Sequence, residues 1–159
     1  MKKIFLLLIM ISLVTLVACG GGQVQDPNEA WVRAANSELA RVSIGGFGYK
    51  SSTVPANTWT SWNQTGMPVV RRIVAEVPDG YVLQITGHAD ASGPELPTGN
   101  KPGNVRISSD RARNVYNNLT RNLDSPKFTH RGVGSSQPID GVDGRDSAQR
   151  RVSFRIVQQ

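Results

Sequence analysis

The sequence has few of the residues that build disulfide, metal and redox sites. Its 159 residues include one cysteine, Cys19, and two histidines, His88 and His130. A single cysteine excludes an internal disulfide, and two histidines without a second cysteine match no strong metal motif. We therefore expect no cofactor, no disulfide and no metal site, although His88, Asp90 and His130 stay open as the one metal-binding alternative.

Signatures of catalysis and of nucleic-acid binding are also lacking. The chain has no G-x-S-x-G nucleophile motif and no obvious second pair of carboxylates for glycan cleavage. It has no block of Lys and Arg, and aromatic residues make up only 6% of it, which disfavours a nucleic-acid partner. We predict no catalytic residues and a binding function, with a cell-wall hydrolase as the less favoured enzyme alternative.

No apolar run is long enough to cross a membrane comfortably. The longest, residues 4–17, has 14 residues and follows Lys2 and Lys3, whereas a membrane-spanning helix needs about 20. This order predicts a signal peptide over residues 1–18. Small residues before Cys19 resemble the lipobox of bacterial lipoproteins, in which the cysteine becomes the lipidated first residue, acylated for example by palmitate. An ordinary secretory signal is the alternative.

The charge is basic but moderate. Removal of residues 1–18 takes away two lysines and no acidic residue, so the formal charge falls from +6 to +4. Such a surface fits an acidic polymer such as peptidoglycan, an anionic membrane, or simply solvent. We expect a lipidated cysteine and tether over residues 19–41, including a short helix over 27–40, and one domain over residues 42–159.

The hydrophobic pattern of residues 42–159 predicts an α+β domain. The first strand is expected over residues 42–50 and a helix over 56–77, broken or kinked near Gly66 and Pro68. The remaining elements are strands over 81–86, 128–133 and 151–157 and a helix over 109–123. The order is β-α-β-α-β-β, with two helices on one face of a mixed sheet. Trp59 and Trp62 are expected to pack in the core, with ligand stacking as the alternative.

Two charged residues stand where these elements meet. Asp90 follows the strand over 81–86, and a loop of three prolines and three glycines over 92–104 leads to the next helix. With Ser108 as N-cap, Arg111 would lie in the first turn, where a cation opposes the helix dipole. Its anionic partner is therefore either Asp90, in a structural ion pair, or a ligand carboxylate. In the second case Asp90 would hold an ammonium group, and the pair would recognise a zwitterion.

Several motifs in order resemble the OmpA-like peptidoglycan-binding domain of peptidoglycan-associated lipoproteins. They are Gly87-His88-Ala89-Asp90, Gly93, Asn104, Ile107-Ser108, Arg111-Ala112-x-x-Val115, the stretch 132–138 and Gln149-Arg150-Arg151-Val152. The resemblance covers roughly residues 42–157. The long loop and its K-P-G-N run look most like spirochaetal lipoproteins.

The resemblance implies a ligand and its binding residues. Asp90 and Arg111 match the pair that holds the free amino-acid end of diaminopimelate in the peptidoglycan stem peptide. Asn104 would shape the loop and Arg151 would add positive charge, whereas His88 matches a family histidine that packing explains equally well. Ornithine lacks the carboxylate that Arg111 requires, so this pair favours diaminopimelate.

Some residues depart from the family pattern. Ala89 replaces a threonine, Ile107 a leucine and Gln149 an asparagine. Asp90 and Arg111 are also 21 positions apart, more than is usual in the family, which puts the geometry of the pocket in doubt.

Together these features predict a lipid-anchored outer-membrane protein that faces the periplasm and tethers the membrane to peptidoglycan without covalent attachment. The alternative is a surface-exposed adhesin that binds host molecules. The sequence leaves open the orientation, the oligomeric state and any partner protein of the envelope.

Overall fold

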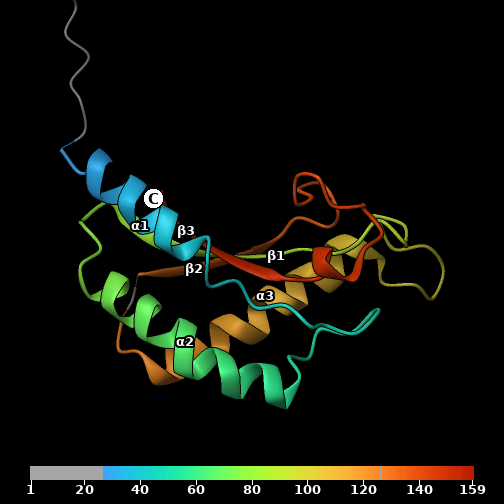
Figure 1. Cartoon of the computed structure of the whole chain (residues 1–159). Coiled ribbons are helices and arrows are strands. Elements are labelled where there is room, and N and C mark those ends of the chain that lie inside the picture. The colour runs from blue at the N-terminus through green and yellow to red at the C-terminus, as the bar shows by residue number, and fades with distance from the viewer. Residues whose placement is uncertain (1–26, 126) are drawn as a thin grey trace, which may run out of the picture.

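The computed structural model describes residues 27–125 and 127–159. Figure 1 shows their arrangement. The elements are α1 (Glu29–Leu39), α2 (Ala56–Ala75), β1 (Tyr81–Gly87), α3 (Gly103–Asn122), β2 (Phe128–Gly132), a 3₁₀ turn η1 (Ser147–Gln149) and β3 (Val152–Gln158).

The sheet is mixed, and β1 is its central strand. Its order is β2-β1-β3, with β1 parallel to β2 and antiparallel to β3. Leu83 and Ile85 of β1 are fully buried, as expected for a strand with neighbours on both sides. On β3, Val152, Phe154 and Ile156 are buried and alternate with more exposed residues, as the sequence predicts. The predicted α+β class with a mixed sheet is confirmed.

Helices α2 and α3 lie together on one side of the sheet, and α1 lies along β3 (Figure 1). Val115 and Leu119 of α3 and Val70 and Ile73 of α2 belong to the same hydrophobic core as the strands. Trp62 stacks on Phe154 with ring centroids 5.5 Å apart, and its Nε1 donates to the carbonyl of Val42 at 2.6 Å. The predicted packing role of Trp62 is therefore confirmed.

Helix α1 docks on the sheet, which the sequence left open. The Asn36 amide donates to the carbonyl of Ile156 at 3.2 Å, and its carbonyl oxygen accepts from the Ile156 N–H at 2.7 Å. Leu39 on the same helix is fully buried. The side chain of Asn36 thus pairs with the outer edge of β3 as another strand would.

The expected first strand over residues 42–50 is wrong. Only Ile44 pairs with the sheet, through one antiparallel bridge to Val152. Gly45, Gly46 and Gly48 follow at once, and Gly46 has a positive φ of 75°, so the chain turns away instead of extending the ladder.

The predicted break near Gly66 and Pro68 is not found, and one predicted helix start also differs. Helix α2 runs through Pro68 without a break, because buried residues on both sides hold it to the core while Pro68 itself is exposed. Helix α3 begins at Gly103, not at residue 109. Among the described residues, no helix has both the length and the apolar character needed to cross a membrane.

The ends of β1 and β2 approach the backbone of α3 closely. A Cβ on Gly87 would lie 1.9 Å from the Ser108 carbonyl oxygen, and one on Gly132 would lie 2.2 Å from the Ser109 nitrogen. Glycine at both positions lets α3 pack directly on the sheet. This close approach brings the residues after β1 next to the middle of α3.

Candidate functional site

Asp90 lies three residues beyond the end of β1 in a firmly held segment. The N–H groups of His88, Ala89 and Ala91 donate to the carbonyls of Arg151, Gly134 and Gly144 at 2.7–2.9 Å. Neighbouring loops on both sides thus fix the backbone around Asp90. The residue is only 3% exposed.

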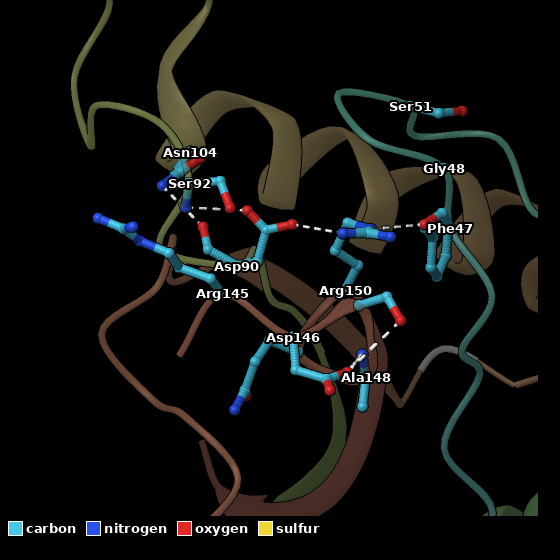
Figure 2. A network of polar contacts seen from close by, with 12 residues as sticks. Phe47, Gly48, Ser51, Asp90, Ser92, Asn104, Arg145, Asp146, Ala148 and Arg150 are labelled. Carbon is cyan, nitrogen blue, oxygen red and sulfur yellow. Dashed lines mark hydrogen bonds and ion pairs between the residues drawn. The ribbon is translucent and has the colours of Figure 1, made fainter. Parts of the chain in front are cut away.

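The Asp90 carboxylate has two partners (Figure 2). Its Oδ2 forms an ion pair with Arg150 Nη1 at 2.6 Å, and its Oδ1 accepts from the Ser92 N–H at 3.0 Å. Burial raises the pKa of Asp90, but the hydrogen bonds from Arg150 and Ser92 outweigh it and leave the pKa below its ordinary value. Asp90 is therefore ionised at neutral pH.

Arg111 is fully buried and donates only to backbone carbonyls. Its Nε, Nη1 and Nη2 reach the carbonyls of Ser51, His88 and Gly48 at 2.8, 2.7 and 3.2 Å. The guanidinium also lies 5.1 Å from the centre of the Phe47 ring. Three of its five N–H groups are thus engaged, and no carboxylate among the described residues lies within ion-pair distance.

The charge of Arg111 is consequently not neutralised by a direct partner. Burial and the nearby charge of Arg150 lower its pKa to about 10, and the charge of Asp90 partly opposes this change. The guanidinium stays protonated at neutral pH. A buried guanidinium without a carboxylate partner is stabilised by an anion that binds beside it.

The predicted helix-dipole conflict at Arg111 is wrong. Because α3 begins at Gly103, Arg111 lies in the third turn, and Ser108 is not an N-cap. Instead, the Ser108 hydroxyl donates to the Val105 carbonyl and accepts from the Gly134 N–H. The structural ion pair of Asp90 with Arg111, one of the two alternatives, is not formed either, since Arg150 takes that place.

Asn104 in the first turn of α3 holds the long loop. Its amide nitrogen lies 3.0 Å from the carbonyls of Asp90 and Gly93 and 3.1 Å from Glu95 Oε1. Glu95 in turn accepts from the Ser135 N–H. The loop that separates Asp90 from Arg111 in the sequence is therefore held against Asp90 and the first turn of α3.

Asp90, Asn104 and Arg111 line one cavity of about 70 Å³. Arg150, Lys50 and Lys101 also line it, so four cations and one carboxylate surround it. Several waters or one small polar group would fill this volume. Arginine presents a planar fork of donors that matches a carboxylate, and Asp90 can accept from an ammonium. The cavity suits the charged end of an amino acid.

The sequence matches no family model and no curated protein. The fold is similar to solved structures. For the OmpA-like domain of FopA1 from Francisella tularensis the TM-score is 0.52, with 21% identity over 71% of this chain and 68% of that one. For the C-terminal domain of Helicobacter pylori MotB it is 0.55, with 16% identity over 74% of this chain and 86% of that one.

A longer periplasmic domain of Helicobacter pylori MotB gives a TM-score of 0.51, with 19% identity over 78% of this chain and 71% of that one. The chain has an OmpA-like fold. At these identities the likeness concerns the fold alone.

Within the OmpA-like fold, Arg151 does not join the other predicted site residues. Its guanidinium donates to the carbonyls of Gln149 and Gln137 at 3.3 and 3.1 Å, away from the lining of the cavity. Arg150, which the sequence reasoning passed over, occupies that place. Both follow the buried Gln149, and only the path of the chain into β3 decides which arginine faces Asp90.

Gln149, which stands where the family has asparagine, organises the loop before η1. Its Oε1 accepts from the Ile139 N–H at 2.8 Å, and its Nε2 lies 3.2 Å from the carbonyls of Val142 and Asp143. Because the side chain is 1% exposed, these bonds fix the loop firmly.

His88 is a packing residue in the described structure. It is 3% exposed, its Nε2 lies 2.8 Å from the Ser153 hydroxyl, and it does not line the cavity. Burial, and then the charges of Arg151 and Arg131, lower its pKa to about 4, although the nearby backbone of Gln137 partly opposes this change. His88 is therefore neutral at physiological pH.

In residues 27–125 and 127–159, no group of three or more His, Cys, Asp and Glu side chains could hold a metal ion. His130 lies instead against the ring of Tyr116, with centroids 4.8 Å apart. The predicted signal peptide over 1–18 and the lipidated Cys19 lie outside the described residues.

Proposed function

We propose that this protein binds peptidoglycan without covalent attachment, through the free amino-acid end of diaminopimelate in the stem peptide. The observation that carries the proposal is a buried arginine, Arg111, with no carboxylate partner and with Asp90 beside the same cavity. The OmpA-like fold supports it, because a solved neighbour of this fold is described as a periplasmic domain.

The ligand would contribute one charge to each side of the cavity. Its carboxylate would accept from the N–H that remains on each terminal nitrogen of Arg111, as a bidentate pair. Its ammonium would donate to Asp90, whose oxygens each retain a second acceptor site. Asn104 would act indirectly by holding the loop that closes the cavity, and Arg151 by positioning the chain near Gln149.

Arg150 makes the carboxylate of the ligand a requirement. It already engages Asp90, so a ligand with an ammonium alone would compete with an existing ion pair while the charge of Arg111 remained unmatched. A zwitterionic ligand provides both charges: its carboxylate pairs with Arg111 and Arg150, and its ammonium pairs with Asp90. We propose on this basis that diaminopimelate binds and that ornithine, which has only the amine, binds poorly.

We further propose that the mature chain is anchored in the outer membrane by a lipid on Cys19 and faces the periplasm. Residues 1–19 give the order of charged, apolar and lipobox residues that this requires. The domain would then tether that membrane to the cell wall. Its role is binding without cleavage.

Co-sedimentation of the full chain with purified sacculi tests this function. Asp90→Asn removes the charge with almost no change of shape and should lower binding by at least about tenfold. Asp110→Asn is the matched control, because it removes a carboxylate of α3 that pairs with Arg106 outside the cavity. Thermal unfolding of each variant verifies that it is folded.

Three results would overturn the proposal. The first is equal binding by wild type and Asp90→Asn. The second is salt-sensitive binding that survives Asp90→Asn, which would favour a general surface attraction of the adhesin type. The third is release of soluble fragments from the sacculi, which would indicate a hydrolase.

A further inference from the structure

A second, larger cavity lies farther along α3, on the same side of the helix as Arg111. It has a volume of about 370 Å³ and is lined by Thr53, Val54, Trp59, Asn114, Asn117, Asn118 and Arg121. Three other open depressions on the described surface have similar volumes, so the chemistry of the lining, and not the volume, distinguishes this one. It is separate from the cavity at Asp90, with which it shares no lining residue.

The lining combines one indole ring with several amides and contains no carboxylate. Trp59 is half-buried and stacks on Trp62, with centroids 5.3 Å apart, so the ring is held in place. Amide side chains both donate and accept hydrogen bonds, which matches hydroxyl and acetamido groups. A flat apolar ring beside them matches the C–H face of a sugar.

The amides differ in how far the protein already uses them. Asn114 donates to the Ser52 carbonyl at 3.0 Å and so holds the wall formed by residues 51–54 against α3. The side-chain Oδ1 of Asn118 accepts from the Asn122 side-chain amide at 2.9 Å. Within the described chain, the exposed side chains of Asn117 and Arg121 make no hydrogen bond or ion pair, so both are available to a ligand.

The two cavities are spaced as a stem peptide and its sugar would be. Arg111 and Asn118 are seven residues apart, or nearly two turns, and therefore lie on one face of α3 about 10 Å apart. The path from the free amino-acid end to the sugar runs through the diaminopimelate side chain and the peptide residues before it. Three extended residues alone span about 10 Å, so the peptide is long enough to cover this distance. A ligand with its amino-acid end at Asp90 would reach the second cavity with its glycan.

We propose that the cavity at Trp59, Asn117 and Arg121 binds the N-acetylated sugars of the glycan strand. This inference rests on the proposed function for the choice of polymer, but the site itself is independent of Asp90. Trp59 would contact the sugar ring, Asn117 and Asn118 its acetamido and hydroxyl groups, and Arg121 its oxygen atoms.

Insoluble chitin, a polymer of N-acetylglucosamine without peptide, is the probe. The full chain should sediment with chitin and much less with cellulose, which lacks the acetamido group. Because the sugar is uncharged, raising the salt concentration should change chitin binding less than twofold. Soluble chitin oligomers should shift the side-chain amide NMR signals of Asn117 and Asn118.

Variants locate the binding. Asn117→Ala combined with Arg121→Ala should lower the affinity for chitin at least about fivefold. The matched control combines Asn63→Ala on α2 with Arg113→Ala on α3, which remove the same side-chain types away from the cavity. Trp59→Leu should abolish binding, but the surface pair keeps the test decisive if that variant fails to fold.

Separate results report on the two proposals. Two independent sites are supported if the Asp90→Asn variant still binds chitin but no longer binds a diaminopimelate peptide. No chitin binding, equal binding to chitin and cellulose, or equal loss in the control pair overturns the glycan site. In any of those cases, sacculus binding that depends on Asp90 would still support the proposed function.

Discussion

At the scale of single residues, Arg111 serves the fold and the cavity together. It is the largest fully buried side chain of the described chain. It joins α3 to the loop of residues 47–51 through the carbonyls of Gly48 and Ser51, and to the segment after β1 through the carbonyl of His88. Lysine has the same charge but cannot present a planar fork to all three.

We predict that Arg111→Lys lowers the free energy of unfolding by about 3 kcal/mol, because buried carbonyls lose charged donors. Arg113→Lys, on the exposed side of α3, should change it by less than about 0.5 kcal/mol. Urea denaturation measures both. Equal stability of the two variants would show that the carbonyl contacts of Arg111 contribute little.

His88 gives the protein a pH-dependent stability. Its pKa is lowered in the fold from 6.5 to about 4, so between these pH values the unfolded chain binds a proton that the folded chain does not. Stability is complete above pH 6.5 and falls as the pH drops towards about 4, by about 3 kcal/mol for this shift.

The variant His88→Gln should lose most of this dependence while it keeps a hydrogen-bonding group near Ser153. Thermal unfolding as a function of pH provides the measurement. A variant that loses stability on acidification as steeply as the wild type would assign the effect to other groups.

At the scale of elements, the glycine of the Gly87-His88-Ala89-Asp90 motif has a steric explanation. A methyl group at Gly87 would meet the backbone of α3 at 1.9 Å, whereas one at Gly45 would have no atom within 4 Å. We predict that Gly87→Ala costs at least about 2 kcal/mol of unfolding free energy and that Gly45→Ala costs little. Comparable denaturation midpoints for the two would contradict the close packing of β1 on α3.

The outer edge of β3 is protected by α1. Asn36 pairs with both backbone groups of Ile156, and Ile44 pairs with Val152 farther along the same strand. We expect Asn36→Ala to lower stability by about 1 to 2 kcal/mol and to increase aggregation, because it leaves a strand edge without its cover. Light scattering on heating, with Asn63→Ala as the exposed control, tests this. Unchanged aggregation would mean that α1 is dispensable at this edge.

At the scale of the whole molecule, the sequence pattern predicts the three observed strands better than their connections, although it wrongly adds a first strand over residues 42–50. Alternation in β3 and the apolar run of β1 locate both strands within one residue or so of their observed bounds. The start of α3 is missed because prolines and glycines precede it, although Gly103 and Asn104 belong to its first turn. Composition cannot show that Gly103, with a φ of 74°, packs against the loop at Leu96.

The candidate site is predictable in part for the same reason. The positions of Asp90, Asn104 and Arg111 follow from the motifs, and the structure brings all three to one cavity. Two of the three carbonyl partners of Arg111 come from residues 48–51, a segment 60 or more positions away along the chain. Likewise, whether Arg150 or Arg151 contacts Asp90 depends on how the chain enters β3, and no local sequence pattern predicts this path.

The central claim concerns the charges of the ligand, so a titration with two synthetic stem tripeptides tests it most directly. One tripeptide ends in diaminopimelate and the other in ornithine, and the full chain is titrated with each by calorimetry. The account predicts that the diaminopimelate peptide binds at least about tenfold more tightly, because only its carboxylate meets Arg111 and Arg150. Equal affinity for the two peptides, or tighter binding of the ornithine peptide, would contradict it.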